Sequence, residues 1–421
     1  MRVGSLSLHQ LPPLSLPMGY FLTAPLFGLA AGVFFALSGE LPWLSRWMPD
    51  ALAGTHLLVL GFMGMVMMGA LVQLIPVISA AEVPWACRLA PWIRLTLGVG
   101  VAALACGLSL EIAALFSTAI VALTLAFGMF LVPLCLCLVR RIGGGDAIQT
   151  IRVAVLCLLV TVVIGVYLAT DHLAHRGWTP LHLGFGLVGW LFLLIAAVSF
   201  QVIPMFHVAP NYPRWLTRGL PILSVAGILI QSRWLIGACF LAYSLTTLYL
   251  LRVRKRRAPD VTLRFWQLAM VVLSLGVLAW AMAPASEQLL GALYLIGFVL
   301  TVMLGMLHKI VAFLVFMHLQ RTCLATGSSV ADLPTMHQIV PLSQSRWQLF
   351  IHSATIVLCV SAAYFPSLGP FAGVALAADF VWLLSSLVIA HQCFRRTLPR
   401  LVVQRAQIPK SVPSRRAGHT C

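Results

Sequence analysis

Three long apolar segments of this chain carry variants of one residue pattern, and that repetition constrains the fold more than any other feature. The clearest copy has Gly61, Phe62, Val66, Met67, Gly69, Gln73 and Pro76. Another copy keeps the same spacings with Gly297, Phe298, Val302, Met303, Gly305, Lys309 and Ala312. A looser copy between them has Gly189, Trp190, Ala197, Gln201 and Pro204. Each interval holds four apolar segments, which predicts three repeated units of four helices.

The composition indicates that these segments lie in a bilayer. Hydrophobic residues are 61% of the 421-residue chain, charged residues are only 9%, and the mean hydropathy is +1.00. A soluble domain would need more charge to cover its surface. A helix needs about 20 apolar residues to cross the hydrocarbon. Twelve segments come near that length: 19–38, 52–80, 91–109, 112–139, 151–171, 179–206, 217–231, 233–251, 262–284, 288–317, 346–363 and 368–392.

The distribution of basic residues predicts the orientation. With twelve spans, 23 lysines and arginines fall on the side of both termini, three fall on the opposite side, and Lys309 lies within a span. The three exceptions are Arg46, Arg176 and Arg233. The positive-inside rule then places both termini in the cytoplasm. Merging the seventh and eighth spans across residues 231–233 would put the arginines between Arg252 and Arg264 outside, so we expect a helix break there.

The predicted organisation is therefore an all-α, multi-pass protein of the bacterial inner membrane. Residues 1–17 form a cytoplasmic segment, 18–392 form the membrane domain, and the basic tail 393–421 is expected to be cytoplasmic and disordered. The repeat units cover about 18–139, 151–251 and 262–392. The net charge of +17 follows from the loop asymmetry and favours anionic lipid head groups. We therefore expect a lipid bilayer, and no nucleic acid, as the partner.

Four histidines are expected at the outer membrane face. His56 and His182 lie at matched places in the first turns of the second and sixth spans, and His172 and His175 lie where the fifth span leaves the membrane. Two facing imidazoles can hold a haem iron, whereas three grouped imidazoles suit copper or zinc. The spacing of His172, His175 and His182 around one helix–helix turn could place all three on one metal ion. Solvated loop histidines without a ligand would equally explain His172 and His175.

Further histidines are predicted toward the cytoplasmic side. His308 falls in the third copy of the pattern, at the depth of the glutamines in the other two. It could ligate a cofactor or form a hydrogen bond within a bent part of the helix. His207 and His318 lie at helix ends, and His207 is a further candidate metal ligand.

Four other polar residues are predicted within the spans. Gln73 and Gln201 each precede a proline by three residues, and we expect their amides to bond the carbonyls that the prolines leave free. Lys309 is expected to extend toward the cytoplasmic interface. Asp379 is the one carboxylate well inside a span, where ionisable groups are usually functional. A satisfied structural carboxylate is the alternative.

Glycines of the patterned segments have two interpretations. They are Gly61, Gly64, Gly69, Gly184, Gly186 and Gly189. Small residues let membrane helices approach closely, and the same residues could make room for a flat macrocycle.

Several segments carry a family resemblance. They are Phe21–Gly28, His56–Phe62 with Gln73–Pro76, His182–Gly186 with Phe200–Phe206, and Gly305–Val311 with Leu319. Together with the three four-helix units, they resemble the catalytic subunit of haem–copper oxidases and nitric oxide reductases. The likeness is closer to the divergent NnrS-type haem- and copper-containing membrane proteins, and it covers about 18–392. It implies bound haem or copper, with His56 at the family's position for an axial ligand of a low-spin haem.

The chain departs from the oxidases at the oxygen-reducing centre. The sixth span lacks His-x3-Tyr, the seventh lacks an adjacent histidine pair, and the tenth lacks His-x-His, with Ala292 at the place of His56. Oxygen reduction is therefore not expected, and the chain is more simply a non-enzyme. The resemblance implies a role in nitric oxide response or respiratory electron handling, with nitric oxide or another diatomic ligand and a respiratory complex as partners. Two alternatives are a cofactor-free transporter or permease, and a factor that delivers haem or copper to a respiratory oxidase.

Overall fold

The computed structural model describes residues 11–79, 81–140, 145–170, 175–255, 259–282, 286–326 and 333–407, which form helices and connections with no β-strand. Within this part of the chain, ten helices are long and apolar enough to cross a membrane. They are Ser15–Ser38, Pro49–Ile78, Ala86–Leu110, Ala113–Val139, Asp146–Thr170, Arg176–His207, Arg233–Arg252, Val261–Met282, Glu287–Thr326 and Pro366–Leu401. The prediction of an all-α, multi-pass membrane protein is confirmed in this form.

Two of the twelve predicted spans are helices outside that group of ten. One is α10 (Arg214–Leu229), which has 16 residues. At 1.5 Å per residue it is about 24 Å long, short of a hydrocarbon core of about 30 Å. The other is α16 (Leu342–Ala362), which has 21 residues but carries buried Gln348 and His352. α10 is therefore too short, and α16 too polar, to be counted among the ten.

The expected break after the seventh span is confirmed. α10 ends at Leu229 and α11 (Arg233–Arg252) begins four residues later. Between them Gln231 has a φ of 51°, a left-handed conformation that a continuing helix does not contain. The hydroxyl of Ser232 accepts a hydrogen bond from the Leu235 amide at 3.3 Å and caps the new helix.

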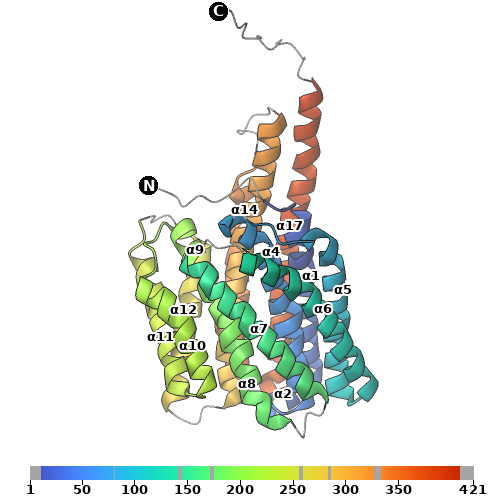
Figure 1. Ribbon diagram of the computed structural model, residues 1–421, viewed down its shortest axis with the longest axis vertical. Helices are drawn as coiled ribbons and strands as arrows, with labels where there is room; N and C mark the ends of the chain where they lie inside the picture. The colour runs from blue at the N-terminus through green and yellow to red at the C-terminus, as the bar shows by residue number, and fades with distance from the viewer. Residues whose placement is uncertain are drawn as a thin grey trace, which may run out of the picture.

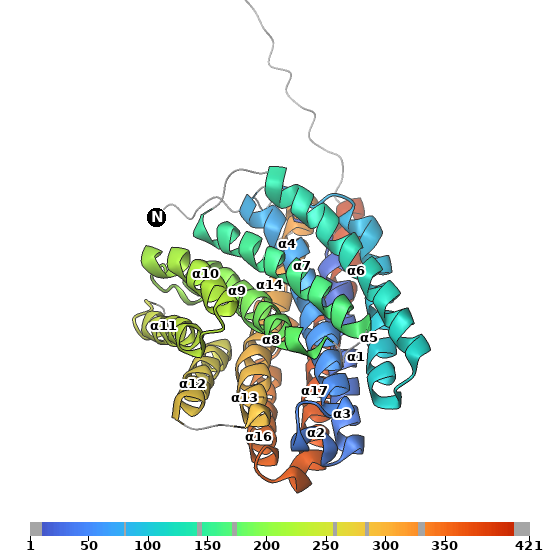
Figure 2. The same ribbon diagram turned by 60° about the horizontal axis from the view of Figure 1, so that its bottom comes forward.

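The three patterned segments are the innermost of these ten helices. Buried residues make up 78%, 67% and 72% of their apolar windows, against at most 50% in the other seven. The remaining helices surround them, with α5 (Ala86–Leu110) and α6 (Ala113–Arg140) on one flank and α10, α11 and α12 (Val261–Met282) on the other (Figure 2). The pattern therefore marks the helices that build the centre of the bundle.

Each inner helix contains a π-helical stretch at the same place in the pattern. η2 (Leu57–Gly64) lies between α3 (Pro49–His56) and α4 (Met65–Ser79). η4 (Gly184–Phe192) lies between α8 (Thr179–Leu183) and α9 (Leu193–His207), and η5 (Ala292–Leu300) lies between α13 (Glu287–Gly291) and α14 (Thr301–Thr326). π-helical turns are rare and concentrate at functional sites. Their recurrence therefore makes this level of the bundle a candidate for the functional site.

The first glycine of each pattern copy packs against a neighbouring helix. A Cβ on Gly61 would lie 2.6 Å from Phe27 of α1 (Ser15–Ser38), and one on Gly189 would lie 2.6 Å from Cys157 of α7 (Asp146–Thr170). A Cβ on Gly297 would likewise overlap Val272 of α12 (Val261–Met282). Neighbouring side chains fill these positions, which supports the helix-packing interpretation of the glycines.

The first and last spans also lie against each other. α1 packs along α17 (Gly369–Gln407), and small residues four apart line both sides. A Cβ on Gly32 would overlap the backbone of Ala377, and one on Gly373 would overlap the backbone of Ala36. This contact joins the two ends of the membrane domain and closes the helices around the inner three.

Two helices extend beyond the rest of the bundle. α14 and α17 project together at the top of Figure 1, and α17 is 39 residues long. The tail was predicted to be disordered from residue 393, but α17 continues to Gln407, so that prediction is wrong for 393–407. Leucine, arginine and glutamine in this stretch are good helix formers. Short helical elements occupy the connections: α2 (Leu41–Leu44), η3 (Arg176–Trp178), α15 (Met336–Ile339) and η7 (Pro366–Leu368).

Candidate functional site

The two matched histidines face each other at the ends of their helices. His56 ends α3 just before η2, and His182 lies in α8 just before η4. Their ring centroids are 6.5 Å apart and their planes differ by 28°. On α7, the absence of a side chain at Gly165 makes room for the His182 ring, because a Cβ there would lie 2.9 Å from its Cε1. The predicted convergence of His56 and His182 is present in the structure.

The hydrogen bonds of this pair define which ring nitrogens are available. His56 Nδ1 lies 2.7 Å from the carbonyl oxygen of Leu52, and His182 Nδ1 lies 3.1 Å from that of Thr161. A carbonyl can only accept, so Nδ1 carries the hydrogen in both rings. In a neutral ring the lone pair is then on Nε2, which is the arrangement that metal-ligating histidines adopt.

The spacing of the pair is compatible with one bridging metal ion. Both imidazoles would hold one ion if their Nε2 atoms turned toward the same point, and their ring centroids are 6.5 Å apart. Imidazole nitrogen is a ligand for copper, zinc and iron. The donor set therefore fits a metal held by two imidazoles.

His175, also predicted at the outer face, is placed differently. The His175 ring stacks on Tyr167 with centroids 3.8 Å apart, and Tyr167 packs edge-on against Trp178. Among the described residues no three or more histidine, cysteine or acidic side chains group as metal ligands. His172 lies outside those residues, so the arrangement of His172, His175 and His182 on one ion stays a prediction.

An apolar cavity of about 740 Å³ lies beside the histidine pair, among the ends of the inner helices that carry it. All three π stretches line it, through Leu58, Val188 and Tyr294 among others. Thr55 and Leu183, the chain neighbours of the two histidines, also line it. Arg46 and Glu287, which belong to its wall, form an ion pair at 2.9 Å. The space suits a small or apolar molecule.

A charged cluster lies at the opposite end of the inner helices. The Lys309 ammonium is 2.9 Å from Asp260 Oδ2, and His207 Nδ1 is 3.7 Å from the same oxygen. Burial alone would raise the pKa of Asp260, but hydrogen bonds from Thr262 and Lys309, with the charges of Lys309 and His207, lower it to about 2. Lys309, expected to extend to the interface, thus pairs with a carboxylate that sequence analysis did not identify.

Other predicted polar residues on that side have separate environments. His308 Nδ1 bonds the Leu304 carbonyl at 2.9 Å, and its buried Nε2 has no hydrogen-bond partner in the described structure. His318 bonds the carbonyls of Leu314 and Pro12. Neither amide atom of buried Gln73 has a described partner, so its predicted bond to a carbonyl freed by proline is wrong. α4 continues through the proline while the Gln73 amide stays out of hydrogen-bonding range.

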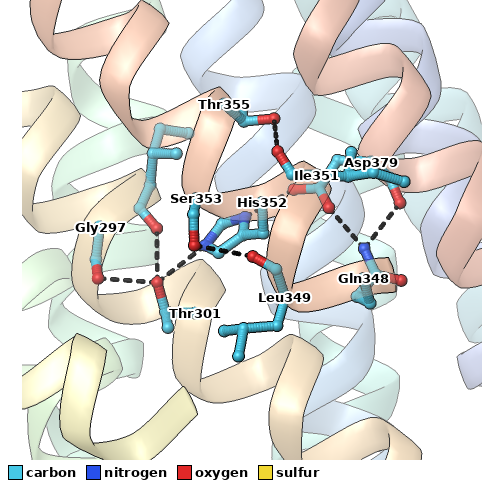
Figure 3. Close-up of polar contacts among 10 residues, drawn as sticks. Gly297, Thr301, Gln348, Leu349, Ile351, His352, Ser353, Thr355 and Asp379 are labelled. Atoms are coloured by element: carbon cyan, nitrogen blue, oxygen red, sulfur yellow. Dashed lines mark hydrogen bonds and ion pairs between the residues drawn. The ribbon is translucent and has the colours of Figure 1, made fainter. Parts of the chain in front are cut away.

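A buried polar network connects three helices (Figure 3). Asp379 of α17 accepts hydrogen bonds from Gln348 of α16, and its Oδ2 lies 2.6 Å from Nδ1 of His352. His352 Nε2 lies 2.8 Å from the hydroxyl of Thr301, the first residue of α14. All four side chains are buried. Asp379 was a candidate from sequence, whereas His352 and Gln348 were missed.

The sequence of α16 contains a signal that could have found them. Its buried polar residues recur at helical spacing: Ser345, Gln348, His352 and Thr355. Its exposed residues include the large apolar side chains of Trp347, Phe350 and Val357. A membrane helix with lipid outside and polar partners inside has this inverted pattern.

Comparison with known proteins adds no family assignment. No model of a known protein family matches the chain, and no curated protein matches it significantly.

Proposed function

We propose that this chain is a twelve-span protein of the bacterial inner membrane, with both termini in the cytoplasm, that binds copper or haem iron through His56 and His182. The facing imidazole pair carries the proposal, because both rings have Nδ1 bonded to a carbonyl and Nε2 left for a ligand. The proposed role is in nitric oxide response or respiratory electron handling rather than oxygen reduction.

The repeat supports the twelve-span arrangement. The three inner helices carry their π stretches at matching positions, and α10 and α16 pack against spans of the bundle rather than apart from it. Counting these two helices with the ten apolar ones gives three groups of four. The excess of basic residues on one side supports cytoplasmic termini.

The surroundings of the histidine pair favour copper over haem. A Cβ on Gly184 would lie 2.8 Å from Ile228, and one on Gly186 would lie 3.1 Å from Thr161. These side chains fill the glycine face where a flat macrocycle would need space. A single ion between two imidazoles needs no such space, and imidazole is a good ligand for copper. Bound copper would supply a one-electron centre, and the adjacent cavity would admit a diatomic molecule such as nitric oxide.

Metal analysis and spectroscopy of the full-length protein test this proposal. Protein purified in detergent from copper- and haem-replete cells is expected to carry about one copper or one haem per chain. His56→Gln and His182→Gln should each abolish the signal. His175→Gln is the matched control, because it removes an outer-face imidazole that stacks on Tyr167 instead. Wild-type protein without copper or haem above background would overturn the proposal.

A cofactor-free transporter is the second candidate, favoured by the cavity of about 740 Å³ where the three π stretches meet. Irregular helix segments around a central cavity are typical of carriers. A metal-free preparation that binds an apolar solute, and loses it when a bulky residue replaces Val188, would support this function. A copper ion that is bound but passes within seconds to a competing chelator would instead support the delivery role.

A further inference from the structure

Asp379 and His352 form a buried acid–base pair that the proposed metal site does not use. Asp379 and His352 are each 0% exposed. The Asp379 oxygens are contacted by His352 Nδ1 at 2.6 Å and by the amide of Gln348. The Gln348 amide also donates to the Asp379 backbone carbonyl at 3.0 Å. Isolated charges are expensive at this depth, so the net charge of the pair decides its stability.

Counting hydrogens shows how many protons the pair holds. A carboxylate beside a neutral imidazole has a net charge of −1, and adding one proton makes the pair neutral. That proton lies either on the carboxyl group or on the imidazole. Because a neutral pair avoids an uncompensated buried charge, the pair is expected to retain one exchangeable proton.

The contacts of the Thr301 hydroxyl also indicate that the His352–Asp379 pair holds one proton. Thr301 Oγ1 lies 2.7 Å from the carbonyl of Gly297 and 3.2 Å from that of Ile296, both in η5. A hydroxyl has one hydrogen, and those carbonyls can only accept it. For every contact to be satisfied, His352 Nε2 must donate to Thr301 while Thr301 donates to η5. The geometry thus corresponds to the pair with its proton bound.

Loss of that proton would change the bond made by Thr301. A deprotonated Nε2 becomes an acceptor, so it competes with the η5 carbonyls for the single hydroxyl hydrogen. Thr301 is the side chain that bonds two backbone carbonyls of η5. Protonation at His352 is therefore coupled to the hydrogen bonding of a π stretch in an inner helix.

The neighbouring elements contribute few other titratable groups. On α16, buried Cys359 interacts electrostatically with Asp379, and on α14 buried His308 does so as well. Farther along α14, Lys309 is paired with Asp260. α1, which packs along α17, contains no Asp, Glu, Lys, Arg or His. No cation other than a protonated imidazole is thus placed to neutralise Asp379 within the described contacts.

We propose that His352 and Asp379 form a proton-binding site within the membrane domain, and that Thr301 transmits its occupancy to η5. The site is on different helices from His56 and His182, so it stands whether or not the chain binds metal. Its ligand is a single proton exchanged with the aqueous phase.

Infrared difference spectroscopy as a function of pH, on the full-length protein in lipid nanodiscs, tests the site. Wild-type protein is expected to show one titration step that combines carboxyl and imidazole bands. Asp379→Asn and His352→Gln should remove the step, whereas His391→Gln, on the same helix as Asp379, should leave it unchanged. A step that persists in Asp379→Asn, or a wild-type protein with no such step while folded, would overturn the proposal.

Thr301 provides a test that keeps both members of the pair. Thr301→Val removes the acceptor of the Nε2 hydrogen, so the imidazole band of the proton-bound state should shift in frequency. Thr301→Ser keeps the hydroxyl and should keep the wild-type frequency. Equal imidazole bands for the valine and serine variants would contradict the coupling to η5. This comparison also decides the case if His352→Gln does not fold.

Discussion

His56 and His182 come from different inner helices, yet their imidazole rings face each other with centroids 6.5 Å apart. Each lies just before a π stretch, and each has its Nδ1 bonded to a backbone carbonyl. The pair is thus held in one orientation by the main chain, which presents two Nε2 atoms without help from other side chains.

The pair should bind metal as a unit. Because one imidazole holds an ion much less well than two, His56→Gln, His182→Gln and the double variant are expected to lose copper to the same extent. Affinity should also fall as pH is lowered, since the ligating imidazoles must be neutral. Equilibrium dialysis against a copper buffer at several pH values measures both effects. Additive losses in the single variants, or affinity independent of pH, would contradict the shared site.

Asp260 should make folding sensitive to acid. Its pKa is lowered from 3.8 to about 2, so the stabilisation is present above pH 3.8 and is lost as the pH falls toward 2. A shift of this size corresponds to about 2 kcal/mol. Thermal unfolding in detergent between pH 5 and pH 2.5 should show this loss in wild type and less of it in Asp260→Asn. Asp50→Asn removes a carboxylate elsewhere and should leave the acid sensitivity of wild type.

The Lys309–Asp260 pair should show energetic coupling. Either Lys309→Gln or Asp260→Asn leaves one partly buried charge without its partner, which is costly. We expect each single variant to lower the unfolding temperature, and the double variant to be no worse than the more damaging single one. Differential scanning fluorimetry of the four proteins completes the cycle, and strict additivity would exclude the coupling.

The contact between α1 and α17 should tolerate no added methyl group. Gly32→Ala and Gly373→Ala each place a Cβ against the backbone of the other helix, and such overpacking costs about 1–3 kcal/mol. Gly128→Ala in α6 is the same substitution where nothing lies within 4 Å of the new Cβ, so it should be neutral or stabilise by up to about 1 kcal/mol. Unfolding temperatures of the three variants compare these sites. A destabilisation by Gly128→Ala as large as that at Gly32 would contradict the packing argument.

The sequence predicted the parts of this fold that repeat along the chain. The pattern starting at Gly61, Gly189 and Gly297 predicted three related helices, and these are the inner ones in the structure. Close helix contact requires small residues at regular spacing. His56 and His182 were expected to lie close together because they occupy matched places relative to that pattern. The break at Gln231 followed from the charge distribution, which would otherwise place a basic cluster on the wrong side.

The remaining features depend on how each helix is rotated about its own axis. The spacing of residues along a single helix does not determine that rotation. Asp379 meets His352 only because α16 and α17 turn those faces together. Gln73 has a suitable spacing to Pro76, yet its amide finds no partner in the described structure. Asp260 lies in a connection, where its contact with Lys309 depends on the path of the chain between helices.

The packing of α1 against α17 has a consequence for biosynthesis. The ribosome completes the first of these helices long before the last, so the small-residue face around Gly32 meets lipid until Ala377 and its neighbours enter the membrane. Contacts between such distant parts of a chain form late. The inner helices are therefore enclosed only after the whole domain has been inserted.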